Sequence, residues 1–419
     1  MEICCQWSIA SAFDGRSPVS YRDENMLQKG AALVTQLKIL ADERIEVVRR
    51  SMEAGGYDLL VVASPENVLY ATGFESMGAT INRRYSYAAL VTKDDVLMVV
   101  PAADFAPAID AGIAPDKVHT FGKFFFSGTT PSAHLEVKSG TFEDALSQAL
   151  RRLNPASVLA ERAYLSVAAQ DVLAAGAAEI ADATPWMLAL RGRKLPFEIA
   201  LLRHATCITE RAIEAGIAAA AIGVTDKEVA SVVASHMASA GGLPRNVTVV
   251  GGMRSALADA MSTERPLERG NLLRFDIGCS FYGYKSDMAR TAVIGEPTSL
   301  QSARYDALLH GLHVAVEKTR AGARASDIFE AGVKAVEDKG LRPYRRQHIG
   351  HAIGMTVYET PVVTPESGEV LQAGSVFCLE TPYYEPGWGG MMVEDTGLVT
   401  ERGFELFSTI DRSLRVVSA

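Results

Sequence analysis

The segment LLRFDIGCSFYGYKSDMARTAVIG, residues 272–295, combines two apolar, strand-like runs with two aspartates at their edges. Asp276 follows the run 272–275, Asp287 precedes the run 290–294, and Gly278, Tyr282 and Gly283 lie between them. This pattern predicts two antiparallel strands joined by a turn. Aspartate is uncommon inside strands, and a buried charge is costly unless it is paired or bound to a metal. Because aspartates on facing strands repel each other, we expect a cation between them.

Three more metal-binding side chains lie in the downstream segments RRQHIGHAIGMTVYETP (345–361) and VFCLETPYYEPGWGGMMVEDTGLV (376–399). Glu380 and Glu394 each end an apolar run, and His351 is predicted to lie in a turn between glycines. Any one of these acids alone is more often an ordinary strand-end or surface group, and a lone histidine is more often a satisfied core or loop residue. Taken as a set, the residues in these apolar and glycine-rich surroundings predict a metal site.

The predicted donor set consists of four carboxylates and one imidazole, which is a hard, oxygen-rich combination. Such a set favours manganese, cobalt or iron(II), with zinc as a further possibility, over a thiolate-bound or square-planar metal. Five ligands are too many for one tetrahedral ion. We therefore expect two divalent metal ions that share carboxylates, with manganese as the leading candidate.

The order and spacing of these residues resemble the pita-bread metallohydrolase family, which includes methionine aminopeptidase, aminopeptidase P, prolidase and creatinase. The matching motifs are Asp276-Ile-Gly, Asp287-Met-Ala-Arg-Thr291, Gly350-His351-Ala-Ile-Gly354, Glu380-Thr-Pro-x-Tyr384 and Val393-Glu394-Asp395. The resemblance covers residues 190–400 well and continues more weakly into the N-terminal part. It implies an α+β catalytic domain of the pita-bread fold, with an internal pseudo-two-fold repeat, behind an α/β creatinase-like domain.

The resemblance also implies roles for the ligands. Asp276, Asp287 and Glu394 would hold one ion, and Asp287, His351, Glu380 and Glu394 the other. The implied reaction is hydrolysis of a C–N bond, as in an Xaa-Pro peptidase, by a water molecule that the metal activates. Glu380 is the candidate general base, which carries the proton to the leaving group.

Two positions depart from the peptidase pattern, which usually carries two further histidines. The matching places hold Asp259, within 255–265, and Tyr358, seven residues after His351. An acceptor and a phenolic donor or acid suit a cationic or small polar substrate. The alternatives are therefore a small-molecule specialist, either a creatinase-like amidinohydrolase or a relative of dimethylsulfoniopropionate lyase, and a non-catalytic binding module. Each of the two residues has an ordinary interpretation as well, Asp259 as a loop cap and Tyr358 as a packing residue.

We expect the whole chain to divide into an N-terminal arm (1–30), a creatinase/prolidase-like domain (31–185) and the catalytic domain (186–419). In the second part, apolar spacing predicts a helix over 37–52 that ends at a Gly-Gly pair. A strand at 58–63 precedes a turn at 64–67, and strands at 87–92 and 96–101 flank a hairpin turn. The run SPENVLYATGF (64–74) resembles the N-terminal domain of creatinase and prolidase.

A faint repeat is present in the catalytic part. A helix at 199–221 is followed by a capping box, Thr225 with Glu228, and by a second helix that ends near residue 241. A helix at 305–319 is followed by another between a cap at 322–327 and Gly340, and strands follow each helix pair. Such a duplication sets two halves face to face and places the metal ligands at the seam.

The composition limits the kinds of partner that the protein is expected to bind. The net charge of -9 argues against nucleic acid, because phosphate binding needs a basic face. Five cysteines are an odd number without metal-type spacing, which fits reduced thiols in the cytoplasm. We expect no signal peptide and no membrane span, and we expect a small molecule or short peptide as the substrate. The family resemblance implies a homodimer.

Overall fold

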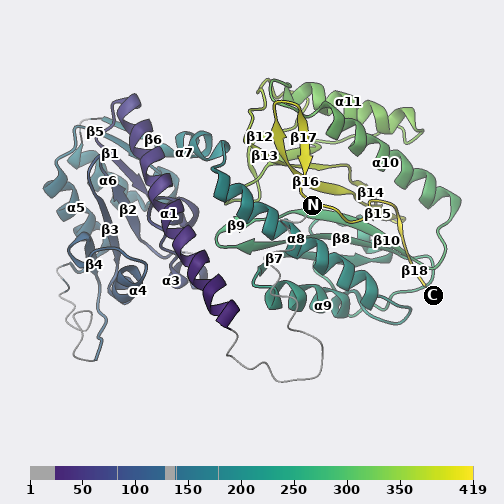
Figure 1. Ribbon diagram of the computed structural model, residues 1–419, viewed down its shortest axis with the longest axis horizontal. Helices are drawn as coiled ribbons and strands as arrows, with labels where there is room; N and C mark the ends of the chain where they lie inside the picture. Colours follow the sequence, from purple (N-terminus) through teal and green to yellow (C-terminus); the bar gives the residue numbers. More distant parts are fainter. Residues whose placement is uncertain (1–23, 83, 128–136, 138, 178, 419) are drawn as a thin grey trace. The chain divides into compact units, whose positions relative to one another are not determined.

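The computed structural model describes residues 24–82, 84–127, 137, 139–177 and 179–418 (Figure 1). Contacts divide the chain into two compact units, one that ends at Leu190 and one that begins at Arg191. The division lies within helix α7 (Ala183–Gly192). Among the described residues, none of the helices combines the length and the apolar character that a membrane crossing requires.

The N-terminal unit contains a mixed six-stranded sheet in the order β4-β3-β2-β1-β5-β6. The strands are β1 (Leu59–Val62), β2 (Ala88–Val91), β3 (Val96–Pro101), β4 (Val118–Phe121), β5 (Ser157–Ala160) and β6 (Glu179–Asp182). β2 and β3 form the expected antiparallel hairpin, with Ala88 opposite Val99. The parallel pairs β1·β5 and β5·β6 make the unit an α/β domain, as predicted.

Its helices are α1 (Glu24–Gly55), α2 (Pro65–Thr72), α3 (Met77–Ile81), α4 (Phe105–Asp110), α5 (Phe142–Leu153) and α6 (Val167–Gly176). The predicted helix over 37–52 is part of α1, which begins earlier, so that residues 24–30 of the expected arm are helical. The rest of that expected arm, residues 1–23, lies outside the described residues.

The turn predicted at 64–67 is wrong, because these residues start helix α2. The Ser64 hydroxyl accepts a hydrogen bond from the Asn67 backbone N–H, and Pro65 occupies the first helical turn. Both features are helix-start signals, since an N-cap oxygen satisfies a free amide and proline lacks the N–H that would be unpaired there.

The C-terminal unit is built on a larger sheet in the order β12-β11-β13-β16-β10-β8-β7. These strands are β7 (Leu243–Gly251), β8 (Leu272–Phe281), β10 (Met288–Ile294), β11 (Gly350–Ala352), β12 (Glu359–Val362), β13 (Val376–Glu380) and β16 (Glu394–Thr400). At its margins lie β9 (Tyr284–Lys285), β17 (Gly403–Leu406) and β18 (Arg415–Val417), and β14 (Tyr383–Glu385) pairs with β15 (Gly389–Met391). β8 and β10 are antiparallel neighbours, as the sequence predicted.

The predicted internal repeat is confirmed. Helices α8 (Pro196–Ala219) and α9 (Asp226–Ser239) precede β7, β8 and β10, whereas α10 (Ser299–Lys318) and α11 (Ala325–Asp338) precede β11, β13 and β16. The strands of the two halves follow mirrored orders in the sheet and meet where β10 pairs with β16. In the view of Figure 1, α9 lies at the lower edge of this unit, below β7 and β8, and α11 lies at its upper edge, above β12 and β17. The capping box of Thr225 and Glu228 opens α9 as expected.

Two residues of the Asp287-Met-Ala-Arg-Thr291 motif join the halves. The guanidinium of the fully buried Arg290 lies 2.7 Å from Asp395 Oδ1 and donates to the Glu394 carbonyl at 2.6 Å. The Thr291 hydroxyl donates to the Met392 carbonyl at 2.9 Å and accepts from the Met392 N–H at 2.8 Å. These contacts fix the strand that carries Glu394 against the strand that follows Asp287.

Candidate metal centre

Three carboxylates converge at the seam between the halves. One oxygen each of Asp276, Asp287 and Glu394 lies within 4.8 Å of the others. Asp276 on β8 and Glu394 on β16 both lie opposite Ala289 of β10, so they share one row of the sheet. Asp287 lies two residues before Ala289, which puts it on the same side as Ala289 in the strand alternation. The position of the cluster thus follows from strand register.

Glu380 and His351 extend the cluster through the second half. Glu380 of β13 lies opposite Glu394, and His351 of β11 lies opposite Cys378, two residues before Glu380. His351 Nε2 is 3.9 Å from Asp287 Oδ2. The structure therefore brings the five predicted ligands together from both halves. His351 lies in strand β11, so the turn that the sequence predicted for it is wrong.

Burial and mutual repulsion outweigh the nearby positive charges at three of the carboxylates. Burial raises the pKa of Asp276 to about 6, although the charge of Arg274 opposes this. Burial and the neighbouring acids raise the pKa values of Asp287 and Glu394 well above the usual range. Glu394 Oε2 is buried and has no hydrogen-bond partner among the described residues. This donor set fits divalent cations, which would satisfy the free oxygen and offset the repulsion.

Glu380 differs from the other acids because its pKa is lowered rather than raised. His348 Nδ1 is 2.8 Å from Glu380 Oε1. Burial favours the protonated form, but the close approach and charge of His348, together with His351 and Arg346, outweigh it and lower the pKa of Glu380 below its ordinary value. No role was assigned to His348 from the sequence, because its distance to Glu380 depends on how β11 and β13 pair.

Tyr358 and Asp259, which replace histidines of the peptidase pattern, lie near the carboxylate cluster. The Tyr358 ring stacks on the His351 ring with 3.9 Å between centroids, and its hydroxyl is 3.5 Å from His348 Nε2. Asp259 is exposed in a turn, and its charge contributes to the raised pKa of Asp276 after the larger effect of burial. Both side chains therefore lie near the predicted ligands.

Arg274 is a residue of the site that sequence reasoning missed. Its side chain is fully buried, with Nη1 2.9 Å from Asp276 Oδ2. Nη2 donates to the carbonyls of Leu257 and Ala258 at 2.8 and 2.6 Å. Arg274 thereby ties the turn before Asp259 to a predicted metal ligand. A signal was present, because residues two apart on a strand point to the same face.

A second arginine lies on the Glu380 side. The Arg346 guanidinium carbon is 5.6 Å from the centre of the Tyr384 ring, and its charge also lowers the pKa of Glu380, after the larger effects of burial and of the two histidines. Asn246, on the other side, donates from Nδ2 to Asp287 Oδ1 at 3.1 Å. The acids are therefore oriented by polar side chains, which is typical of a metal centre.

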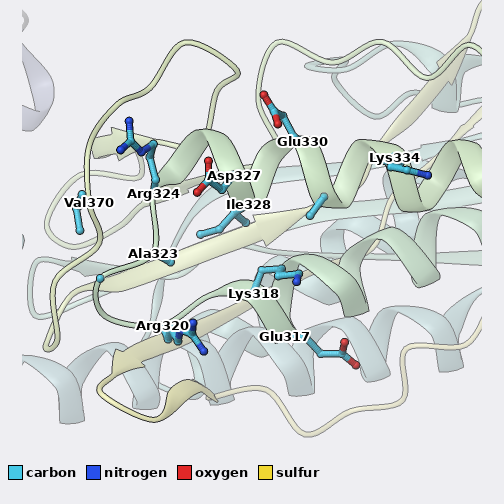
Figure 2. Close-up of a pocket in the computed structure, with 12 residues that line it drawn as sticks. Glu317, Lys318, Arg320, Ala323, Arg324, Asp327, Ile328, Glu330, Lys334 and Val370 are labelled. Atoms are coloured by element: carbon cyan, nitrogen blue, oxygen red, sulfur yellow. The ribbon is translucent and has the colours of Figure 1, made fainter.

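A pocket of about 720 Å³ lies elsewhere in this unit, between the end of α10 and the start of α11. Figure 2 shows Arg324 and Asp327 close together there, with Glu330 and Lys334 farther along α11. Basic and acidic side chains alternate along its lining, and none of the predicted ligands is among them. We therefore place the chemistry at the seam of the sheet.

Comparison with known proteins agrees with this geometry. Residues 200–401 match metallopeptidase family M24, and residues 44–192 match the creatinase/prolidase N-terminal domain. The chain belongs to the pita-bread metallohydrolase family. As a member of this family it is a metal-dependent hydrolase that uses divalent metal ions. The interpretation as a non-catalytic binding module is therefore not retained.

Relatives in this metallohydrolase family match nearly the whole chain. An Xaa-Pro dipeptidase of Pyrococcus furiosus is 26% identical over 89% of this chain and 99% of its own length. The solved prolidase from Pyrococcus furiosus superposes with a TM-score of 0.71 at 25% identity and covers 87% of this chain and all of that one (100%). An X-Pro aminopeptidase from Thermotoga maritima has the same fold, with a TM-score of 0.76 at 21% identity over 89% of this chain and 99% of that one.

Proposed function

We propose that this metallohydrolase cleaves the bond before proline in short Xaa-Pro peptides. The observation that carries the proposal is the convergence of the carboxylates of Asp276, Asp287 and Glu394, with Glu380 opposite Glu394 on the neighbouring strand. Glu394 Oε2 has no hydrogen-bond partner among the described residues. The relatives that match the chain over most of its length support the substrate class, since they are named Xaa-Pro dipeptidases.

The proposed ligands are the five residues that the sequence singled out. Asp276, Asp287 and Glu394 would hold one divalent ion, and His351 and Glu380, with shared carboxylates, the second. When bound, such ions lower the pKa of water and polarise a carbonyl group. We take manganese as the leading candidate, because carboxylate oxygens dominate the set.

Glu380 is the proposed general base. Its lowered pKa keeps it ionised at neutral pH, so that it can accept a proton from the attacking water and deliver it to the leaving nitrogen. His348, at 2.8 Å from Glu380 Oε1, holds the carboxylate in place. A base that is oriented in this way needs little rearrangement during the reaction.

Tyr358 and Asp259 are the proposed substrate contacts. Burial, together with the charges of Glu380 and the other acids, raises the pKa of the Tyr358 hydroxyl, which therefore stays protonated and can donate a hydrogen bond. The exposed Asp259 carboxylate is suited to accept from a cationic group, such as the free amino group of a dipeptide. Arg274 fixes the turn that carries it.

The second candidate is a small-molecule specialist on the same scaffold, an amidinohydrolase or a lyase of sulfonium compounds. It is favoured by the same two positions, where the peptidase pattern has histidines and this chain has Asp259 and Tyr358. The two proposals share the metal ligands and differ only in what contacts the substrate.

We further propose a division into an arm (1–30), a creatinase-like domain (31–185) and a catalytic domain (186–419), a homodimer and a cytoplasmic location. The unbridged thiols of Cys279 and Cys378 support a reducing compartment, since both are buried and free. The homodimer rests on the family resemblance alone.

The test is an activity panel on full-length protein with added Mn(II). We expect turnover of Xaa-Pro dipeptides and none of matched dipeptides that lack proline. Glu380→Gln serves as the control for contaminating peptidases. Turnover confined to guanidino compounds, small amides or sulfonium compounds would refute this proposal and support the second candidate function.

A further inference from the structure

The centre contains two different donor groups that share Glu394. The first consists of the oxygens of Asp276, Asp287 and Glu394. In the second, a nitrogen of His351, Sγ of Cys378 and an oxygen of Glu394 lie within 4.8 Å of one another. The first group is all oxygen, whereas the second offers one nitrogen, one sulfur and one oxygen. Metals of different softness prefer such groups.

Cys378 faces the centre because of its place in β13. It lies opposite His351 on one neighbouring strand and opposite Thr396 on the other, and it precedes Glu380 by two residues. Its side chain therefore shares the face that carries Glu380. The thiol is fully buried, and Sγ lies 3.3 Å from the Thr396 hydroxyl.

A second observation points to a ligand at this place. Glu394 is 1% exposed, and its Oε2 atom has no hydrogen-bond partner among the described residues. A buried carboxylate oxygen without a donor is costly, and a cation removes the cost. Because Glu394 contributes an oxygen to both donor groups, its carboxylate lies beside Cys378 and His351 as well as beside the two aspartates.

We propose that Cys378 is a metal ligand and that the two metal positions prefer different ions. The position of His351 and Cys378 takes a thiophilic divalent ion, zinc or cobalt, whereas the position of Asp276 and Asp287 takes a hard ion such as manganese. On binding, the Cys378 S–H bond breaks, a sulfur–metal bond forms and the proton passes to solvent. This inference rests on the metal centre of the proposed function and replaces manganese at one of its two positions.

Cys279 provides a matched control within the same sheet. It is also fully buried, on β8, but its Sγ lies 3.6 Å from the Ala205 carbonyl and 3.7 Å from the Thr209 hydroxyl. It belongs to neither donor group. Substitution of Cys279 thus tests for loss of a buried thiol without loss of a ligand.

The experiment is absorption spectroscopy of full-length protein loaded with Co(II), because a thiolate bound to cobalt gives an intense near-ultraviolet charge-transfer band. Cys4 and Cys5 lie outside the described residues, so both are first replaced by serine. We expect the band in this background and in its Cys279→Ser derivative, and its loss in the Cys378→Ser derivative. Absence of the band in the background protein, or its persistence after Cys378→Ser, overturns the proposal.

Elemental analysis gives a second readout. From an equimolar mixture of zinc and manganese we expect one ion of each per chain, and Cys378→Ser should weaken zinc binding by about tenfold or more. Asp276→Asn should reduce manganese and leave the cobalt–thiolate band intact. Two manganese ions per chain in the background protein would contradict the proposal. If Cys378→Ser does not fold, the spectrum and metal content of the background protein and its Cys279→Ser derivative test the proposal.

Dipeptide hydrolysis measured on the same preparations separates this inference from the proposed function. Xaa-Pro turnover without a thiolate band refutes only the role of Cys378. A thiolate band without Xaa-Pro turnover refutes only the substrate class.

Discussion

Glu394 and Asp395 are neighbours on β16, and both are buried. Their surroundings shift the pKa values of the two carboxyl groups in opposite directions. Glu394 faces other acids, which together with burial raise its pKa well above the usual range. Asp395 contacts Arg290 and Arg412 and accepts from the Ser408 hydroxyl, and these outweigh burial and lower its pKa. The comparison shows that burial alone does not mark a metal ligand. The mark is a buried acid for which the protein supplies too little positive charge.

Glu359 repeats the Asp395 arrangement at another place. Its carboxylate lies 3.1 Å from Arg191 Nη2 and 2.7 Å from Lys194 Nζ, and these cations lower its pKa against the effect of burial. It lies next to Tyr358 but on the inward side of strand β12. Asp395 and Glu359 are thus neutralised by protein cations, whereas the pKa values of Asp276, Asp287 and Glu394 are raised by burial and by one another.

The largest expected effect concerns Glu380, which has a histidine partner and also lies in the centre. Glu380→Gln should keep the fold and most of the metal but lower kcat by about 10²–10⁴-fold, since the base is removed. Steady-state kinetics together with metal analysis check this. Full turnover in the variant would remove Glu380 from the mechanism.

The next prediction compares substitutions of Asp395 and Glu394, the two neighbours on β16. Asp395→Asn should destabilise the protein by about 3–5 kcal/mol, because it leaves the buried Arg290 without its countercharge. Urea unfolding of the metal-free protein measures the change. The matched variant Glu394→Gln should leave metal-free stability equal or higher, since it removes a repelled charge, and should lose metal instead. Equal destabilisation by both substitutions would contradict the comparison.

The pH dependence of metal-free stability sharpens the same contrast. An acid whose pKa is raised in the folded state binds protons more tightly there than in the unfolded chain, so its contribution falls as pH rises. For Asp276 this decline runs from about pH 4 to about pH 6, and for Asp287 and Glu394 it continues higher. The melting temperature of metal-free protein should therefore fall as pH rises through 6, and bound metal should remove the trend. A flat profile without metal would refute the assignment.

Asp395 and Glu359 affect the pH dependence of stability in the opposite direction. Their lowered pKa values mean that their stabilisation is complete above the usual carboxyl pKa and is lost only as pH falls below it. Acid unfolding below about pH 4 should consequently persist in the metal-loaded and metal-free protein alike.

The smallest expected effect concerns Tyr358. Tyr358→Phe keeps the ring that stacks on His351 and removes only the hydroxyl. If the hydroxyl donates to substrate, the loss should be about 0.5–1.5 kcal/mol, which is about 2–10-fold in kcat/KM. Metal content and melting temperature should stay unchanged. Unaltered kinetics would assign Tyr358 to packing against His351 only.

The family, the two-part organisation of the catalytic half and the types of metal-binding residue were all predictable from the residues alone. Acids such as Asp276 inside an apolar strand are costly, so their presence and order are informative without coordinates. Helix pairs were recognisable because capping boxes and glycine stops are local signals, as at Thr225 and Glu228. The first turn of α2 was missed although its signals, Ser64 and Pro65, are equally local.

The contacts between side chains, in contrast, could not be predicted without the folded arrangement of the strands. The pairing of His348 with Glu380, the clamp of Arg274 on the Asp259 turn and the place of Cys378 beside His351 all depend on strand register and loop paths. Register is set by hydrogen bonds between strands distant in the chain, and a shift of one residue would turn each side chain to the other face. The same long-range pairing put His351 in a strand and gave Asp395, but not Glu394, its arginines.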